Sequence, residues 1–208
     1  MASPFISQPT PGDDTYLASP QPDTNYGAGA SMIVGQFAGS KYHIALKFDF
    51  NSIPAGSECV DATLEMTMST KLGTSGQTIR IYRAVRAWTT AGATWNKYDG
   101  ANAWTTAGGT DHDDDRDATV VCDKALAGDE ANGAKEFELD AAAIEAMLPG
   151  NGFTNNGFLM RHVNEATNQT YTFRPGNWTT AAERPKITIS YTTGGGPVFR
   201  KTIYAFMI

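Results

Sequence analysis

An acidic run between residues 111 and 117 is the densest group of side chains that could bind a metal ion. Asp111, Asp113 and Asp115 occupy alternate positions, which is the spacing of carboxylates in a calcium-binding loop. The glycine and the distant bidentate glutamate of such a loop are missing from this run. A Ca²⁺ site and a solvated acidic loop tip therefore both remain open, and the missing ligands favour the loop tip.

Aromatic side chains form the second group of interest, because tryptophan and tyrosine rings stack on sugar faces and dominate many interfaces. Tyr98, Trp104 and Trp178 lie in polar segments that are rich in glycine and asparagine. We interpret them as the best candidates for exposed rings that bind a ligand, while burial of these rings stays open.

Catalytic motifs are missing from the sequence. The 3 histidines, His43, His112 and His162, are isolated, and no nucleophile elbow, zinc-binding histidine pair, P-loop or Cys-x-x-Cys motif occurs. The 22 acidic residues do not by themselves identify a pair for glycoside hydrolysis. His162 lies in a predicted strand without a partner motif, so we interpret it as structural. We predict that the chain is not an enzyme and needs no cofactor beyond the Ca²⁺ considered above.

Size and charge exclude several classes of protein. A chain of 208 residues is long enough for one β-domain with a sizeable core, and 21 glycines and 10 prolines favour many turns. The net charge of −6, without a basic cluster in the sequence, argues against nucleic-acid binding. No stretch approaches the roughly 20 apolar residues of a membrane span, and we expect no signal peptide. Cys59 and Cys122 are expected to be free thiols, although pairing stays open.

Alternating hydrophobicity predicts the elements that must position these side chains. Residues 44–50 and 60–68 alternate apolar and polar side chains with the two-residue period of a half-buried strand. A glycine-rich turn at 73–76 leads to a strand at 78–85, so we expect 60–68 and 78–85 to form an antiparallel hairpin. We expect Phe48, Leu64, Ile81 and Ile187 to lie in the core, since each occupies the apolar side of its strand.

The segment 86–135 shows little alternation and is too long for a plain loop. We expect it to be pinned by tryptophans or to extend as a functional excursion. Beyond it, the pattern predicts a strand at 136–139, a short helix capped by Asp140 and ended by Pro149 and Gly150, and strands at 157–163, 170–174 and 186–191.

These elements predict an all-β fold: a jelly-roll-like antiparallel β-sandwich with one short helix and a C-terminal extension. The expected organisation is an N-terminal lead-in at 1–12, the sandwich domain at 13–193, and a glycine hinge with an apolar tether at 194–208. The tether is too apolar to remain in water and too short to span a membrane. We expect its side chains to mediate assembly by strand addition to a neighbouring subunit, with docking on its own domain as the alternative. The assembly residues are Val198, Phe199, Ile203, Tyr204, Phe206 and Ile208.

A series of short motifs runs from residue 13 to residue 191. In order they are 13–17 (DDTYL), 25–27 (NYG), 33–35 (IVG), 46–49 (LKFD), 53–56 (IPAG), 62–64 (ATL), 81–82 (IY), Trp88, 94–96 (TWN), Trp104, 157–161 (GFLMR), 171–173 (YTF) and 184–187 (RPKI). Their shared order resembles the DNRLRE domain family. Trp88 and Trp95 fall on motif positions, so the resemblance places them in the core or in a loop-pinning role.

The resemblance implies a non-catalytic β-sandwich with a carbohydrate-binding, adhesive or structural role. Such domains are appended to polysaccharide-active enzymes and cell-surface proteins, and also occur among virion proteins of tailed phages. We favour a structural or adhesive protein on the outer surface of a phage virion. It would act as a head or tail decoration, fibre or spike component, with other virion proteins and copies of itself as partners and host glycans as a further ligand. The alternative is a carbohydrate-binding module of an extracellular or cell-surface protein.

Overall fold

The computed structural model describes residues 3–9 and 13–193. The strands, in chain order, are β1 (Ser3–Ser7), β2 (Asp14–Ala18), β3 (Met32–Phe37), β4 (Ser40–Leu46), β5 (Glu58–Gly73), β6 (Gln77–Ala84), β7 (Arg116–Leu126), β8 (Gly133–Leu139), β9 (Phe158–His162), β10 (Gln169–Phe173) and β11 (Lys186–Thr192). The helix α1 spans Ala141–Met147, and a 3₁₀ turn spans Ala181–Glu183.

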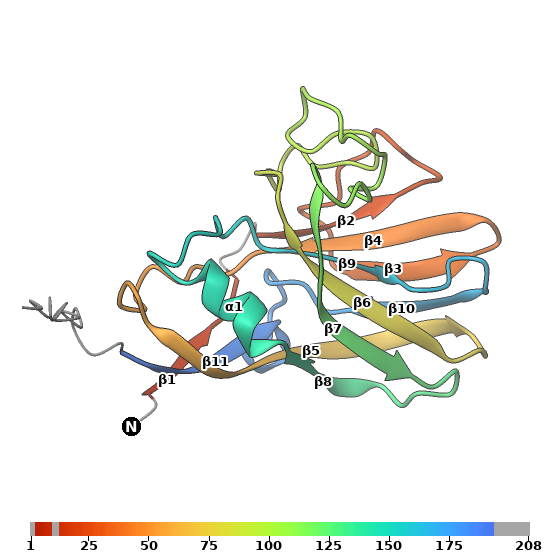
Figure 1. The fold of residues 1–208 in the computed structure, drawn as a ribbon. Coiled ribbons are helices and arrows are strands. Elements are labelled where there is room, and N and C mark those ends of the chain that lie inside the picture. The colour runs from red at the N-terminus through yellow and green to blue at the C-terminus, as the bar shows by residue number, and fades with distance from the viewer. Residues whose placement is uncertain (1–2, 10–12, 194–208) are drawn as a thin grey trace, which may run out of the picture.

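The strands form one antiparallel sheet that curls on itself (Figure 1). Its order is β1-β11-β5-β10-β3-β4-β9-β6-β7, while β2 pairs with β4 and β8 pairs with β5. The β3–β4 hairpin joins the half of the sheet around β5 to the half around β9 and β6. The all-β class with one short helix is confirmed.

The core lies inside this curl and follows the predicted alternation. Phe48, Leu64, Ile81 and Ile187 are each at most 1% exposed, as expected; Phe48 follows the end of β4, and the other three lie on strands. Leu64 is paired with Ile187 of β11 on one side and with Phe137 of β8 on the other. The two-residue period therefore identified which side of each strand faces the core.

Replacing Leu64 by alanine should lower the free energy of unfolding by about 2–5 kcal/mol, the usual range for a buried leucine. The side chain is 0% exposed and lies on the strand that pairs with three others, so its neighbours have little room to collapse into the cavity. Equilibrium unfolding in urea measures the change. Leu72→Ala on the same strand is the matched control, because that side chain is 53% exposed and its loss should change stability little. A loss below about 1 kcal/mol for Leu64→Ala would contradict its place in the core.

One pairing and one segment differ from the prediction. β5 and β6 are strands joined by a glycine-containing turn, but they do not form a hairpin: β5 pairs with β8, β10 and β11, whereas β6 pairs with β7 and β9. Alternation indicates which side of a strand is apolar and does not indicate the partner. The segment expected to be irregular from 86 to 135 also contains the strand β7 and the start of β8.

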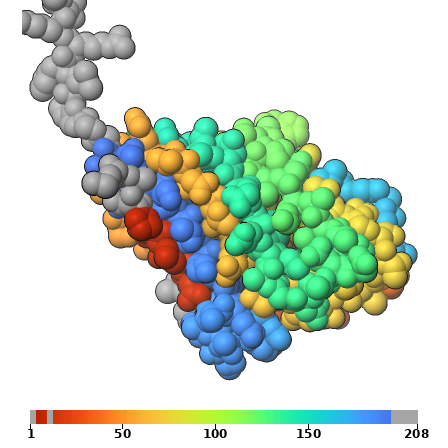
Figure 2. Space-filling model, turned by 90° about the horizontal axis from the view of Figure 1, so that it is seen from below, coloured from red at the N-terminus to blue at the C-terminus, as the bar shows by residue number. Residues whose placement is uncertain are grey.

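Strand β1 lies within the segment expected to be a lead-in. It pairs in antiparallel register with β11, from Ser3 opposite Tyr191 to Ser7 opposite Ile187. Figure 2 shows β1 beside β11, and β11 beside the start of β5. The sheet therefore closes one end of the fold with strands from opposite ends of the sequence.

The helix follows the sequence prediction closely. The side chain of Asp140 accepts a hydrogen bond from the backbone N–H of Ala143, which caps the helix as expected. Ile144 and Met147 of the helix are buried. Within the described residues, neither helical segment is long and apolar enough to cross a membrane. Both cysteines are free thiols; Cys122 is buried and Cys59 is half-buried.

Candidate functional site

The loop between β6 and β7, residues 85–115, packs against the outer side of the sheet and has a small core of its own. Trp88 and Trp104 lie in this core with Ala93, against Leu17, Ala45, Ala84 and Leu159 from the strands. Trp88 donates its indole N–H to the carbonyl of Asn156 at 2.9 Å, and Trp104 donates to the carbonyl of Thr94 at 2.9 Å. The expectation that tryptophans pin this segment is confirmed for both.

The same outer side of the sheet continues beyond the loop as a basic surface. On β9, core-facing Met160 is followed by Arg161, and on β6, core-facing Ile79 and Ile81 alternate with Arg80 and Tyr82. Arg80 and Arg161 are opposite one another in the β6–β9 register. We call the group of Lys41, Arg80, Tyr82, Arg116 and Arg161 the basic face.

Arg116, at the start of β7, is the cation at one end of the basic face in the strand order β4-β9-β6-β7. Its guanidinium lies 3.8 Å from the centre of the Tyr82 ring and donates to the backbone carbonyls of Thr110 and Asp117, each at 3.2 Å. Within residues 3–9 and 13–193 it makes no ion pair with a carboxylate. Partial burial is the main cause that lowers the pKa of Arg116. The charges of Arg161 and Arg80 also lower it, whereas Tyr82 and Asp111 raise it. An anion placed here would relieve that repulsion.

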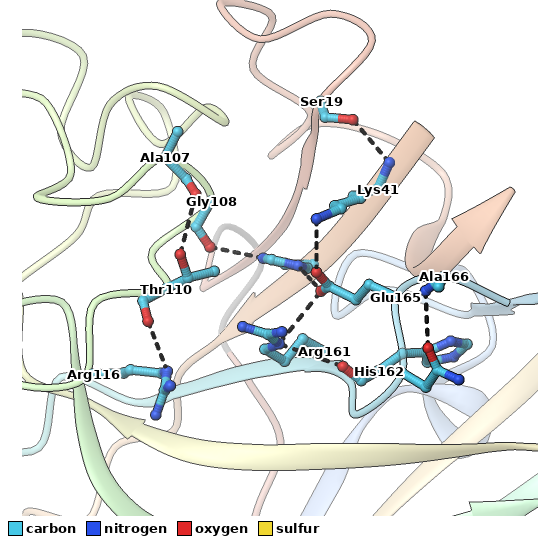
Figure 3. Close-up of polar contacts among 12 residues, drawn as sticks. Ser19, Lys41, Ala107, Gly108, Thr110, Arg116, Arg161, His162, Glu165 and Ala166 are labelled. Carbon is cyan, nitrogen blue, oxygen red and sulfur yellow. Dashed lines mark hydrogen bonds and ion pairs between the residues drawn. The ribbon is translucent and has the colours of Figure 1, made fainter. Parts of the chain in front are cut away.

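The other cations of the basic face have carboxylate partners. Arg80 makes a two-point contact with Asp123 on β7, at 2.6 and 2.5 Å. Lys41 and Arg161 share Glu165, at 3.2 and 3.3 Å, in the turn after β9 (Figure 3). Burial alone would raise the pKa of Glu165, but a hydrogen bond from His43 and the charges of His43, Arg161 and Lys41 lower it to about 2. Glu165 is therefore a permanent anion.

His43 connects this cluster to the loop. Its Nε2 lies 2.6 Å from a carboxylate oxygen of Glu165, and its Nδ1 lies 2.8 Å from the carbonyl oxygen of Gly108. The Trp95 ring lies 4.8 Å from the imidazole, between centroids. A basic surface with the half-buried Trp95 ring beside it can bind a ligand that carries both anionic groups and flat apolar faces.

Comparison with known protein families identifies the class of this domain. Residues 6–120, more than half of the chain, match carbohydrate-binding module family 96. The chain belongs to carbohydrate-binding module family 96. This family 96 module has no match among curated proteins. The match supports the carbohydrate-binding β-sandwich implied by the sequence, while the DNRLRE name and the phage setting stay predictions.

Of the aromatic residues proposed as ligand-binding, Tyr98 and Trp104 pack edge to face in the family 96 module, with ring centroids 5.8 Å apart. Trp104 is only 4% exposed, so the expectation of an exposed ring is wrong for it: the loop has enough apolar side chains to bury the indole. Tyr98 is half-buried, with the Arg86 guanidinium 5.0 Å from its ring centre. Trp178 lies after β10, half-buried beneath Arg174 at 3.8 Å and hydrogen-bonded to Glu183 at 2.8 Å. A role of Tyr98 or Trp178 in binding stays a prediction.

The carboxylates proposed as Ca²⁺ ligands have separate partners. Asp115 is 0% exposed and accepts hydrogen bonds from the backbone N–H groups of Thr105 and Thr106, so it points into the loop. Asp111 accepts from the N–H groups of Asp113 and Asp114, which makes a tight turn. No group of three metal-binding side chains occurs in the part of the chain that the structure describes. In this run Asp115 is a buried structural carboxylate, whereas Asp111 and Asp113 lie at the surface.

The proposed assembly residues Val198, Phe199, Ile203, Tyr204, Phe206 and Ile208 lie outside the described residues. The residues of the basic face were not identified from the sequence. Their only local signal is a polar residue on the outward side of a strand, as with Arg80 and Arg161, and such positions are common on any surface strand.

Proposed function

We propose that this family 96 module is a non-catalytic binding domain that holds acidic glycans on its basic face. The unpaired Arg116 guanidinium carries the proposal, because it is stacked on Tyr82, repelled by neighbouring cations and without a carboxylate partner in the described ranges. A carboxylate or sulfate group of a sugar would complete this cluster. Arginine suits such a contact, since its planar fork bonds two oxygens at once.

The surroundings of Arg116 support a polysaccharide rather than a small free anion. Lys41 lies beyond Glu165 on the same side of the sheet, so cations are distributed over β4, β9, β6 and β7 rather than at a single point. Trp95 adds a half-buried ring beside this row. Repeated acidic sugars along a chain would meet repeated cations. The virion role, the outer-surface location and the oligomer stay predictions that neither the fold nor the family match tests.

Arg116→Met should weaken binding of an acidic oligosaccharide about tenfold or more, because hydrogen bonds to charged groups contribute about 1.5–3 kcal/mol each. A glycan array that compares uronate-bearing, sulfated and neutral oligosaccharides identifies the probe, and calorimetry with the full chain measures the loss. Lys186→Met is the matched control. It removes one positive charge from β11, where Lys186 pairs with Glu65 at 3.1 Å, and should leave affinity nearly unchanged.

Equal losses in the two variants would show that net charge, and not the basic face, determines binding. Preferential binding of neutral glycans would contradict the acidic ligand class. Affinity for the acidic probe should also fall with added salt, because exposed charges are screened.

A further inference from the structure

The ring of His43 makes two hydrogen bonds to groups that can only accept. The side chain is 2% exposed, and its Nδ1 and Nε2 face the Gly108 carbonyl and the Glu165 carboxylate at 2.8 and 2.6 Å. A carbonyl oxygen has no hydrogen to give, and Glu165 also pairs with Lys41 and Arg161 at 3.2 and 3.3 Å, which keeps its carboxylate ionised independently of His43. Both ring nitrogens must therefore carry a hydrogen, so the observed arrangement contains a doubly protonated, positively charged His43.

The charged groups around His43 are consistent with this state. Glu165 is its direct counter-ion and also pairs with Lys41 from the same strand and Arg161 from β9. His162 follows Arg161 on β9. Burial lowers the pKa of His162 to about 4; the charge of His43 also lowers this pKa, and the charge of Glu165 raises it. The His162 ring is therefore neutral above about pH 4. On β2, Leu17 is opposite His43 in the register. The loop contributes Trp95 and the Gly108 backbone.

A neutral His43 could not keep both contacts. If the remaining hydrogen stays on Nε2 to serve Glu165, the lone pair of Nδ1 faces the carbonyl oxygen of Gly108 and repels it. The opposite tautomer would place a lone pair against a carboxylate, which is worse. Gly108 fits closely here: a Cβ at this position would lie 3.0 Å from Nδ1 of His43 and 2.9 Å from the Trp95 ring. Loss of the proton therefore removes the hydrogen bond between His43 and the Gly108 carbonyl.

We propose that His43 is a positioning residue whose doubly protonated ring fastens the loop at Gly108 and Trp95 beside the basic face, and that loss of one proton releases it. Figure 3 shows Gly108 on the loop and, across from it, Glu165 with Lys41 and Arg161; the His43 ring bridges Gly108 and Glu165. The consequence for ligands rests on the proposed function. Protonation adds a positive charge behind the basic face and holds Trp95 in place, so acidic glycans bind more tightly at lower pH.

The fastening is tested without any ligand. Nitrogen-15 NMR of histidine-labelled full chain reports the protonation of each ring nitrogen, and the spectrum of His43→Gln assigns the His43 signals. Spectra are recorded from about pH 5 to about pH 8, the range in which histidine side chains in general change charge. Because amide exchange itself accelerates with pH, protection factors are compared. We expect the protection factor of the Gly108 amide to fall where His43 loses a ring proton. That amide donates to the Trp95 carbonyl at 2.6 Å. A ring nitrogen of His43 that carries no proton at the low end of this range, or Gly108 exchange independent of the His43 titration, would overturn the proposal.

The consequence for binding uses an oligogalacturonate as probe, because its carboxylates stay ionised over this range. Affinity of the wild type should fall about fivefold or more as the pH rises, whereas His43→Gln should bind with little pH dependence. His162→Leu is the matched control: it removes the neighbouring buried histidine and should keep the wild-type profile. If the NMR result holds and the probe binds at no pH, the fastening of the loop stands and the acidic-glycan function is contradicted. If the probe binds and His43 is singly protonated throughout, the acidic-glycan function stands and the fastening of the loop by His43 is contradicted.

Discussion

Asp115→Ala should lower the free energy of unfolding by about 2–6 kcal/mol, because two buried backbone donors lose their acceptor at roughly 1–3 kcal/mol each. Asp115 is 0% exposed, and its two oxygens accept from the backbone N–H groups of Thr105 and Thr106 at 2.9 Å each. Arg86 lies 3.6 Å away. Alanine would leave these donors unsatisfied inside the loop, and such groups are costly to bury. Urea unfolding measures the loss, and hydrogen exchange should show loss of protection between residues 86 and 115.

Asp113→Ala is the matched control from the same acidic run. Its side chain is 78% exposed and pairs only with the exposed His112 among the ion pairs of the described residues, so we expect a change within about 0.5 kcal/mol. Similar effects for the two variants would contradict a structural role specific to Asp115. A melting temperature that rises with added Ca²⁺ in the wild type would instead restore the metal-site interpretation.

His162 should make the fold less stable as the pH falls from about 6.5 to about 4. The ring is 0% exposed, and neither nitrogen has a hydrogen-bond partner among the described residues. Burial is the main cause that lowers its pKa from 6.5 to about 4. Within this window the unfolded chain binds a proton that the folded chain does not. The contribution of neutral His162 to the free energy of unfolding is therefore fully present above about pH 6.5 and is lost as the pH falls to about 4. The loss should be roughly 2–4 kcal/mol.

Asp14 contributes with the opposite sign in an overlapping window. Burial raises its pKa from 3.8 to about 6, against a hydrogen bond from the Gly176 amide, so the folded chain binds the extra proton and gains stability as the pH falls. The pH profile of the wild type alone therefore does not isolate His162. The difference in unfolding free energy between the wild type and His162→Leu does, because Asp14 is common to both.

Relative to the wild type, His162→Leu should gain unfolding free energy progressively as the pH falls from about 6.5 to about 4. Urea unfolding at several pH values measures the difference. His112→Leu is the control, because that ring is exposed, with 66% of its side-chain surface accessible. A constant difference between wild type and His162→Leu across the window would contradict a neutral buried ring.

The sequence was a good guide to the core and a poor guide to strand partners. Leu64 and Ile187 were placed correctly because a half-buried strand shows its inner side in its own two-residue period. The partners of β5 and β6 depend on how the whole sheet curls, and no local pattern records that. Strand β7 was missed because its apolar residues do not alternate with polar ones. Among residues 116–126 the buried side chains are Val121, Cys122 and Leu126, which do not follow a two-residue period.

The candidate site could not be assembled from the sequence for a similar reason. Lys41, Arg80, Arg116 and Arg161 are scattered over 121 positions of an acidic chain, and only the order β4-β9-β6-β7 brings them to one side. Trp104 was misplaced because its polar neighbours suggested exposure. The loop buries it with apolar side chains from four different strands, which a reading of the neighbouring residues does not reveal.

The pairing of β1 with β11 has a mechanical consequence. The two strands run antiparallel, and Ser3 at the start of β1 is opposite Tyr191 near the end of β11. Among the described elements, β11 is the only strand that pairs with β1. A pull that separates residue 3 from residue 191 would load the hydrogen bonds one after another, like a zipper, instead of shearing them all at once. Peeling of β1 would uncover Phe5, which packs edge-on against Phe50 at 6.1 Å. Under tension the module would therefore yield first at this strand, far along the sheet order from the basic face, so an attached glycan could stay bound while the terminal strand gives way.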